Sequence, residues 1–396
     1  MSWNQQIGKK LNKEVVLQQV LLKPYISRSE IIDHTNLKKA TVANLVNELI
    51  EEQLIVEDGK EKSTGGRRST LLKLNDRAGY ALGIDIGVNY LRGIITNLNG
   101  ETIFDIQQEI AEIAFESYFN KIIHMIQLLE TEVPESPYHI IGLGIAVPGT
   151  IAMDGTIINA PNLKWYNIDL LQLLEPYVDY PLYISNEANA GAFAEFSFIH
   201  NMQHQNMLFV SIGYGIGVGI VINGELYHGE LGFSGENGHM IIQMDGNLCK
   251  CGRNGCWEAY ASEYAFLQEA EKALNVTNLS IEKILSLYAN DHTLQKTFTD
   301  FGRYIAIGLM NLIYTFNPLK IMIGNRITLL QNYIQQDILD TLTSQSSPYI
   351  INQTEIEFST LEDKAIVIGA ASIAINQFLL PSLTRSKIKS TLEDRL

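Results

Sequence analysis

The chain has 396 residues, of which 46% are hydrophobic, so it is long enough to bury more than one core and to form two or three domains. Its longest uncharged apolar run, residues 365–380, contains Gly369, Asn376 and Gln377 and favours a buried helix over a membrane span. The first residues are too polar for a secretory leader, and the cysteines are grouped as metal ligands rather than disulfides, so we expect a cytoplasmic protein.

The net charge of −15 would disfavour nucleic acid as a partner if it were spread evenly. Residues 1–75 carry 12 basic and 9 acidic side chains, whereas the rest of the chain carries 17 basic and 35 acidic ones. The basic and acidic regions are therefore expected to bind different partners.

The first fifty residues show the periodicity of three helices. The first has its apolar face at Leu11, Val15, Val16 and Val20 and ends before Pro24. The sequence 27–30, Ser-Arg-Ser-Glu, predicts a capping box that starts a short second helix reaching about His34. After a turn at 35–37, a third helix buries Val42, Leu45, Val46, Leu49 and Ile50.

The opposite side of the third helix carries Lys38, Lys39, Thr41 and Asn44. Residues of these types contact phosphates and base edges in DNA-binding proteins. A short second helix before a polar third one is typical of a helix-turn-helix, whose last helix enters the major groove. A helical cap with a solvated face is the alternative interpretation of the helices alone.

Two short apolar runs, 54–57 and 70–74, predict the strands of a wing. The loop between them contains Gly65, Gly66, Arg67 and Arg68. Two glycines before two arginines form a narrow, flexible and cationic arm, which suits a narrow minor groove, although an ordinary hairpin loop remains an alternative. We therefore expect residues 1–78 to form a winged helix-turn-helix DNA-binding domain.

From residue 79 the pattern changes to strands alternating with helices. Strands are expected at 82–87, 92–96, 102–106 and 140–147, with an amphipathic helix near 115–131, and a second strand series begins at 208–221. The repeated series predicts two α/β lobes with a cleft between them, occupying residues 79–396.

All three cysteines of the chain follow one histidine in the pattern H-x9-C-x-C-x4-C. His239, Cys249, Cys251 and Cys256 form a complete tetrahedral set for Zn²⁺ and leave no position for a catalytic water. The spacing predicts one structural zinc per chain, in a loop spanning 239–256. Buried structural thiols beside a chance histidine are the alternative.

The sequence Glu236-Asn-Gly-His239, followed by Cys-x-Cys-Gly-x-x-Gly-Cys-x-Glu ending at Glu258, resembles the signature of the ROK family of bacterial repressors and sugar kinases. The resemblance implies a ribonuclease H-like fold of the actin and hexokinase type. It also implies that Glu236, His239 and Glu258 contact sugar hydroxyls, together with Asn186 and Glu187 of the stretch Asn-Glu-x-Asn-Ala.

The turns that hold ATP in ROK kinases are altered in this chain. Where such a kinase has Asp-x-Gly-Gly-Thr-Lys, this chain continues after Asp85 and Gly87 with Val88, Asn89 and Tyr90. Tyr214 replaces a threonine in the second turn, and Asn325 and Arg326 follow Gly324 in the third. The resemblance therefore favours a non-enzymatic repressor over a sugar kinase with an N-terminal extension.

Within the family, the match is strongest to repressors whose inducer is D-xylose, and a pentose suits a sugar pocket that has lost its phosphate site. Glucose or an amino sugar remains the alternative inducer. We expect a homodimer, or a dimer of dimers, that reads a palindromic operator and releases it when the sugar binds.

Overall fold

The structure is a computed structural model that describes residues 3–60, 69–112, 114–199, 205–288, 291–347, 349 and 353–382. Residues 3–51 contain three helices and the short strand β1, and the two strands that follow join β1 in a small three-stranded sheet of order β1-β3-β2. The elements are α1 (Trp3–Leu22), β1 (Ile26–Ser27), α2 (Arg28–Thr35), α3 (Lys39–Glu51), β2 (Ile55–Lys60) and β3 (Thr70–Leu74).

Local chemistry sets the ends of α2. The Ser27 hydroxyl accepts a hydrogen bond from the Glu30 backbone N–H, and the Glu30 carboxylate accepts one from the Ser27 N–H at 2.8 Å, so the expected capping box is confirmed. Asn36 ends the helix in the left-handed conformation, with φ +55°. The expected apolar face of α3 is buried at Val42, Leu45, Val46 and Leu49.

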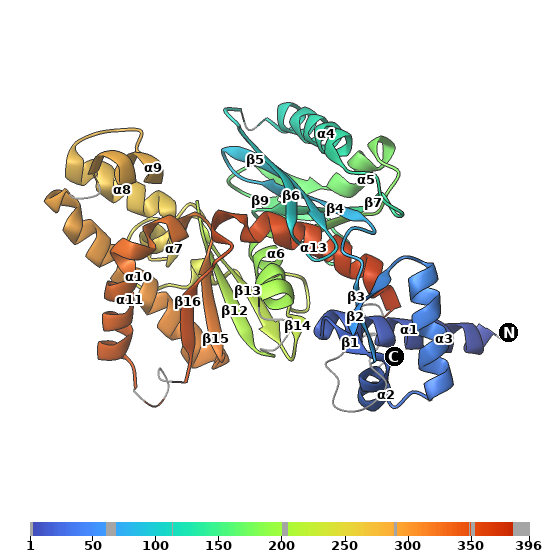
Figure 1. Cartoon of the computed structure of the whole chain (residues 1–396). Helices are drawn as coiled ribbons and strands as arrows, with labels where there is room; N and C mark the ends of the chain where they lie inside the picture. The colour runs from blue at the N-terminus through green and yellow to red at the C-terminus, as the bar shows by residue number, and fades with distance from the viewer. Residues whose placement is uncertain are drawn as a thin grey trace.

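The first lobe is built on a five-stranded sheet of order β11-β7-β4-β5-β6, in which β4 pairs in parallel with β7 and antiparallel with β5. Helix α4 (Phe115–Glu132) covers one face and α13 (Ala365–Leu379) packs on the other (Figure 1). The strands are β4 (Tyr80–Ile86), β5 (Tyr90–Asn97), β6 (Thr102–Glu109), β7 (Ile140–Val147) and β11 (Leu182–Asn186). A smaller sheet contains β8 (Thr150–Ile151), β9 (Ile157–Ala160) and β10 (Trp165–Ile168), followed by α5 (Leu170–Leu174).

The second lobe repeats this plan with a sheet of order β14-β13-β12-β15-β16. Its strands are β12 (Met207–Ile212), β13 (Ile216–Ile222), β14 (Glu225–Leu226), β15 (Lys320–Gly324) and β16 (Glu355–Phe358). Helix α6 (Glu187–Ala194) directly follows β11 of the first lobe and packs against this second sheet. The helices of the second lobe are α7 (Glu258–Ala261), α8 (Glu263–Leu274), α9 (Ile281–Lys283), α10 (His292–Phe316) and α11 (Gln331–Gln345). Each lobe has its own apolar core, so the expected pair of α/β lobes is present.

Helix α13 links the lobes and the N-terminal unit, running from between the two sheets to α1 (Figure 1). A Cβ atom on Gly369 would lie 1.8 Å from the Ala190 carbonyl oxygen of α6, and one on Gly144 would lie 1.8 Å from that of Ala370. The backbones of α13, α6 and β7 therefore touch. At its far end, the Ser382 N–H donates to the Glu14 carboxylate of α1 at 2.8 Å.

The cores of the N-terminal unit and the first lobe are continuous through this helix. Apolar side chains of α1 and α3, such as Val16 and Leu45, form one buried cluster with Ile375 and Leu379 of α13. None of the helices in the described parts of the chain is long and apolar enough to cross a membrane.

Candidate functional site

The strand ends of both lobes face one region, which we call the cleft, where the Thr150 hydroxyl of the first lobe donates to Glu236 of the second. In the first lobe, the carboxyl ends of the parallel strands β4, β7 and β11 lead into Gly87, Pro148 and Glu187. In the second lobe, β12 and β15 pair in parallel and lead into Gly213 and Asn325. Ligands of open α/β sheets bind outside the carboxyl ends of such strands, so the candidate site lies here.

The predicted metal ligands come together beside this cleft. One donor atom from each of His239, Cys249, Cys251 and Cys256 lies within 4.8 Å of the others. The Sγ atoms of Cys251 and Cys256 are 3.7 Å apart, close to the edge of a zinc–thiolate tetrahedron, which is about 3.8 Å when each Zn–S bond is about 2.3 Å. This separation is too long for a disulfide, and all three thiols are free, so the donor set fits a tetrahedral metal.

Two glycines give the metal loop its tight course. Gly252 and Gly255 have φ values of +86° and +82°, which favour glycine. A Cβ atom at Gly255 would lie 1.8 Å from the Gln243 carbonyl oxygen, so no larger residue fits there. Isolated bridges join Ile241 to Cys256 and Leu248 to Asn254, which close the loop on itself.

His239 stands between the thiols and the acidic side chains of the cleft. Its Nδ1 atom lies 3.7 Å from Cys249 Sγ and 3.5 Å from Glu258 Oε1, whereas Nε2 faces Glu236 Oε2 at 4.0 Å. An imidazole has two distinct nitrogens, so one ring can serve a metal through Nδ1 while Nε2 remains directed toward Glu236.

Three glutamates line the cleft from different elements. Glu187 is the first residue of α6, Glu258 is the first residue of α7, and Glu236 accepts a hydrogen bond from the Thr150 hydroxyl at 3.2 Å. Burial raises the pKa of Glu187 to about 8, and the carboxyl groups of Asp85, Glu236 and Glu258 act in the same direction. The raised pKa favours the protonated form of Glu187 near neutral pH, in which the carboxyl group offers a donor as well as an acceptor to a hydroxylated ligand.

The Asn186 side chain is largely committed to the backbone. Its Oδ1 atom caps α6 by accepting from the Ala188 and Asn189 N–H groups, and its Nδ2 donates to the Gly149 carbonyl oxygen at 2.8 Å. One N–H of the amide is left for a ligand. Asn186 thus positions Glu187 and joins β11 to the turn after β7.

The first expected nucleotide turn is filled by a tyrosine. The Tyr90 hydroxyl donates to Asp85 Oδ2 at 2.7 Å, and Asp85 is 1% exposed. Burial raises the pKa of Asp85 to about 7, so this carboxyl group is partly protonated at neutral pH.

Side chains of the second and third turns contact other side chains of the second lobe. The Lys250 ammonium lies 3.6 Å from the Tyr214 ring centre and 3.7 Å from that of Tyr264, a cation held between two aromatic faces. Arg326 pairs with Glu263 at 3.1 Å and with Glu282 at 2.9 Å.

Asn325 completes the filled third turn. It is buried with φ +71°, and its amide donates to the Ser211 hydroxyl at 3.1 Å. No local motif in the sequence marks Ser211, Glu263, Tyr264 or Glu282 as part of this region. Arg326, a basic residue directly after a strand end, is the sequence feature that indicates acidic partners nearby.

The DNA-binding candidates fall partly within the described residues. Lys38, Lys39 and Asn44 are exposed on one side of α3, and Thr41 is partly exposed. Gly65, Gly66, Arg67 and Arg68 lie outside the described residues.

Comparison with known protein families identifies the family that has this architecture. The model of the ROK family matches residues 81–377, which include both lobes, the metal loop and α13. The chain belongs to the ROK family.

Related proteins of this family include both regulators and kinases. The "Xylose repressor" of Bacillus subtilis is 39% identical over 377 residues, covering 95% of this chain and 98% of its own. A crystal structure of a ROK family transcriptional regulator, described as a homolog of the E. coli MLC protein, aligns with TM-score 0.78 and 26% identity, covering 94% of this chain and 98% of its own. A "Glucokinase" of Streptomyces coelicolor is 28% identical but covers only 60% of this chain.

Proposed function

We propose that this ROK protein is a DNA-binding transcriptional repressor that D-xylose releases from its operator. The observation that carries the proposal is the contrast within one cleft. Side chains that would suit a polyol come together at the cleft, whereas the turns that would hold ATP carry Tyr90 bonded to Asp85, Tyr214 beneath Lys250, and Asn325 bonded to Ser211. Phosphoryl transfer needs aligned phosphates as well as a base, so the proposal excludes kinase activity.

In this proposal residues 1–78 form a winged helix-turn-helix domain and α3 enters the major groove. Lys38, Lys39, Thr41 and Asn44 contact DNA from the side of α3 opposite its buried face. Arg67 and Arg68, with Gly65 and Gly66, supply a minor-groove arm in the same proposal. The chain acts in the cytoplasm as a homodimer, or a dimer of dimers, on a palindromic operator.

The proposed sugar site contains Asn186, Glu187, Glu236, His239 and Glu258. Carboxyl groups, an amide and an imidazole suit the hydroxyls of a neutral sugar, because a hydroxyl both donates and accepts hydrogen bonds and these groups supply partners for both. D-xylose is preferred over glucose or an amino sugar because repressors similar to this chain along most of its length are named for xylose.

A zinc ion held by His239, Cys249, Cys251 and Cys256 would supply structure rather than chemistry. Four protein donors leave no open position for substrate or water. Through the His239 ring, the loop orients Nε2 toward Glu236 and so connects metal binding to the sugar site.

The route from sugar to DNA follows α6 and α13. Glu187 begins α6, whose Ala190 contacts Gly369 of α13, and Ser382, three residues after the end of α13, donates to Glu14 of α1. A sugar bridging Glu187 and Glu236 favours one arrangement of the lobes, and only such a preference can shift a conformational equilibrium. The change in the arrangement of the lobes then moves the N-terminal units of the dimer away from the spacing of the two half-sites of the operator.

The test is a binding experiment with DNA duplexes selected on the full-length zinc-loaded protein from a random library. Fluorescence anisotropy is measured with D-xylose, L-arabinose, D-glucose and N-acetyl-D-glucosamine. We expect D-xylose alone to weaken DNA binding, by about 5- to 150-fold for a typical coupling of ~1–3 kcal/mol.

Two variants sharpen this test. Glu236→Gln should bind the duplex normally and ignore D-xylose, because it loses a sugar contact but no DNA contact. Glu225→Gln, a matched change on the exposed edge strand β14, should respond as the unaltered chain does. Release of the duplex by a different sugar would identify that sugar, and not D-xylose, as the inducer. Failure to select any duplex would contradict the proposal that the chain is a DNA-binding repressor.

A further inference from the structure

Tyr138 lies in the turn that leads into β7, at the end of the first-lobe sheet that faces the N-terminal unit. Its N–H donates to the Ala78 carbonyl oxygen at 2.8 Å, and the Tyr80 N–H donates to that of His139, also at 2.8 Å. A Cβ atom on Gly79 would lie 3.1 Å from Tyr138 Cβ, so the two segments are in close contact. The backbone of Tyr138 is therefore fixed to the beginning of the sheet.

The Tyr138 side chain joins elements that belong to different parts of the molecule. Its hydroxyl donates to the Glu52 carbonyl oxygen at 2.8 Å, across 86 residues of sequence. Glu52 ends α3, and carbonyl groups in the last turn of a helix have no helical N–H to accept from. The ring packs edge-on against Phe378 of α13, with ring centres 5.1 Å apart. One side chain thus holds the end of α3 to both α13 and the start of β7.

The other end of β7 lies at the cleft. The strand pairs in parallel with β4 on one side and with β11 on the other, and it is buried along all but its first residue. After the strand, the Gly149 carbonyl oxygen accepts from the Asn186 amide at 2.8 Å. The next residue, Thr150, donates to Glu236 of the second lobe at 3.2 Å. The eight residues of β7 therefore span about 26 Å, at about 3.3 Å per residue, from the cleft to the N-terminal unit.

The junction between the N-terminal unit and the lobes is less closely filled on the side of α1. There Leu21 and Leu22 of α1 and Asn376 of α13 line a cavity. On the side of α3, the junction is held by the bond from Tyr138. A unit that is held at one point and has space at another turns about the held point when its support moves.

We infer that Tyr138 is a positioning residue that couples sugar binding to the position of α3 through its bond to the Glu52 carbonyl oxygen. The inference rests on the proposed repressor function. A sugar that binds Glu236 competes with Thr150 for the same carboxylate, and so changes how the cleft end of β7 is held. Because β7 is paired on both sides, its displacement moves Tyr138, and the hydroxyl bond moves the end of α3 with it. Without that bond, α3 stays on the operator while the lobes rearrange.

The experiment measures the ratio of D-xylose affinities without and with saturating operator, by calorimetric titration of the full-length, zinc-loaded protein. Tyr138→Phe removes only the hydroxyl and keeps the ring on Phe378. We expect this ratio to fall about two- to tenfold, which is the equilibrium effect of losing one typical hydrogen bond. The xylose affinity of the free protein should not change, because the substitution is far from the cleft. Tyr138→Leu is the second variant, in case the ring alone holds the end of α3.

Tyr180→Phe is the matched control. Tyr138 and Tyr180 both lie two residues before a strand of the same sheet, β7 and β11 respectively. The Tyr180 hydroxyl donates to Glu130 of α4 at 2.8 Å, on the face of the sheet opposite α13 (Figure 1). The same atom is removed from a similar bond that does not reach α3, so the ratio should stay that of the unaltered chain. Melting temperature and zinc content show that each variant is folded.

The outcomes distinguish this inference from the function on which it rests. An unaltered chain whose D-xylose affinity is the same with and without operator contradicts the proposed function. A ratio that the unaltered chain shows and that both Tyr138 variants keep overturns the role of Tyr138 alone. An equal fall in Tyr180→Phe, or loss of operator binding in Tyr138→Phe, also overturns it. A fall confined to the Tyr138 variants supports the inference.

Discussion

Asp85 is a carboxyl group enclosed in the first lobe, and its burial costs stability whenever it is charged. Its surroundings contain one donor, Tyr90, the cation Arg92, and the acidic groups of Asp363 and Glu187. Burial outweighs Tyr90 and Arg92 and raises the pKa from 3.8 to about 7. A carboxyl group with a raised folded-state pKa destabilises the fold progressively as the pH rises from the unfolded value through the folded one.

We therefore expect Asp85→Asn to stabilise the protein above pH 7 and to have little effect near pH 4. The amide still accepts from Tyr90 and carries no charge, and about 1.4 kcal/mol per pKa unit gives a gain of ~2–4 kcal/mol at pH 8. Urea unfolding between pH 4 and pH 8 measures the difference. Asp58→Asn, a change in an exposed ion pair with Lys73, is the control. A gain independent of pH would mean that packing, not charge, is responsible.

At the scale of elements, the metal loop has little apolar surface of its own. Met244 is 85% exposed and Leu248 is 73% exposed, so the segment 240–256 has few buried side chains apart from Cys249 and Cys256. The ordering of such a loop comes largely from its ligands, because metal binding and local folding share one free energy.

We expect Cys256→Ser to lose the single bound zinc and to make residues 240–256 sensitive to protease. Elemental analysis measures the metal, and limited proteolysis followed by mass spectrometry locates the cuts. Lys250→Ala is the matched control, since Lys250 stands between two ligands but donates nothing to a metal. Purified unaltered protein without zinc would refute a structural zinc site.

The lysines on the exposed side of α3 lead to a separate prediction about how DNA affinity depends on salt concentration. Each lysine that neutralises a phosphate releases counterions, so Lys38→Ala combined with Lys39→Ala should reduce the slope of log K against log salt by about 1–2. Anisotropy titrations at several salt concentrations measure this slope. Lys272→Ala and Lys296→Ala in the second lobe remove the same charge far from α3 and should leave the slope unchanged. An unchanged slope in the α3 variant would show that DNA binds to a surface other than this side of α3.

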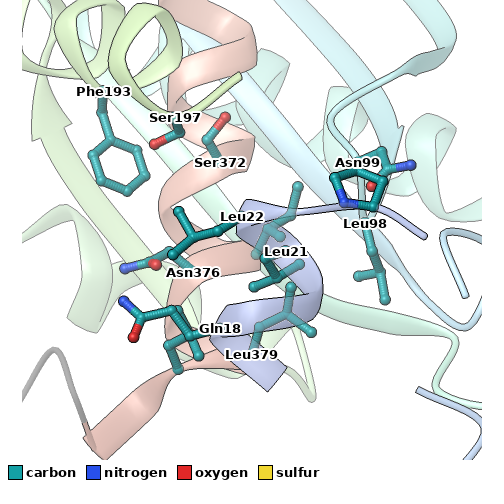
Figure 2. A pocket seen from close by; sticks show the side chains of 13 residues that line it. Gln18, Leu21, Leu22, Leu98, Asn99, Phe193, Ser197, Ser372, Asn376 and Leu379 are labelled. Carbon is teal, nitrogen blue, oxygen red and sulfur yellow. The ribbon is translucent and has the colours of Figure 1, made fainter. Parts of the chain in front are cut away.

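At the scale of the whole molecule, the junction of the N-terminal unit with the lobes is loosely filled. A cavity of about 270 Å³ lies where α1, the β5–β6 turn, the end of α6 and α13 meet (Figure 2). Leu21 and Leu22 reach it from α1, and Ser372 and Asn376 from α13. Ser197 Oγ, also on its wall, is buried without a hydrogen-bond partner among the described residues. Interfaces with such space are able to repack, whereas close-packed ones are not.

We expect Ser197→Leu to fill this space and to reduce the coupling between sugar and DNA. Coupling is measured as the ratio of xylose affinities with and without saturating operator, and reciprocity requires the same ratio for DNA with and without xylose. The ratio should fall toward one while xylose binding to the free protein is unchanged. Ser344→Leu on the exposed side of α11 is the control. An unchanged ratio in Ser197→Leu would show that the junction does not transmit the signal through this cavity.

Several features of this protein are determined by sequence because the interactions that create them are local. Ser27 and Glu30 cap α2 across three residues, the strand expected at 140–147 is β7, and the ligands of the metal loop lie within eighteen residues of one another. Periodicity and spacing record such short-range physics directly. The family followed from the same short motifs.

The tertiary structure alone decided what the side chains of the three altered turns contact and what joins the two lobes to the N-terminal unit. The presence of Tyr90 in the first turn does not by itself determine where its ring lies. The packing of α4 against β5 places the ring between Gly87 and Asp85. Arg326 pairs with Glu263 and Glu282 at sequence separations of 63 and 44 residues, and Ser382, just after α13, bonds to Glu14 at a separation of 368 residues. Pairings over such distances depend on how complete elements pack together, and no local pattern in the chain specifies them.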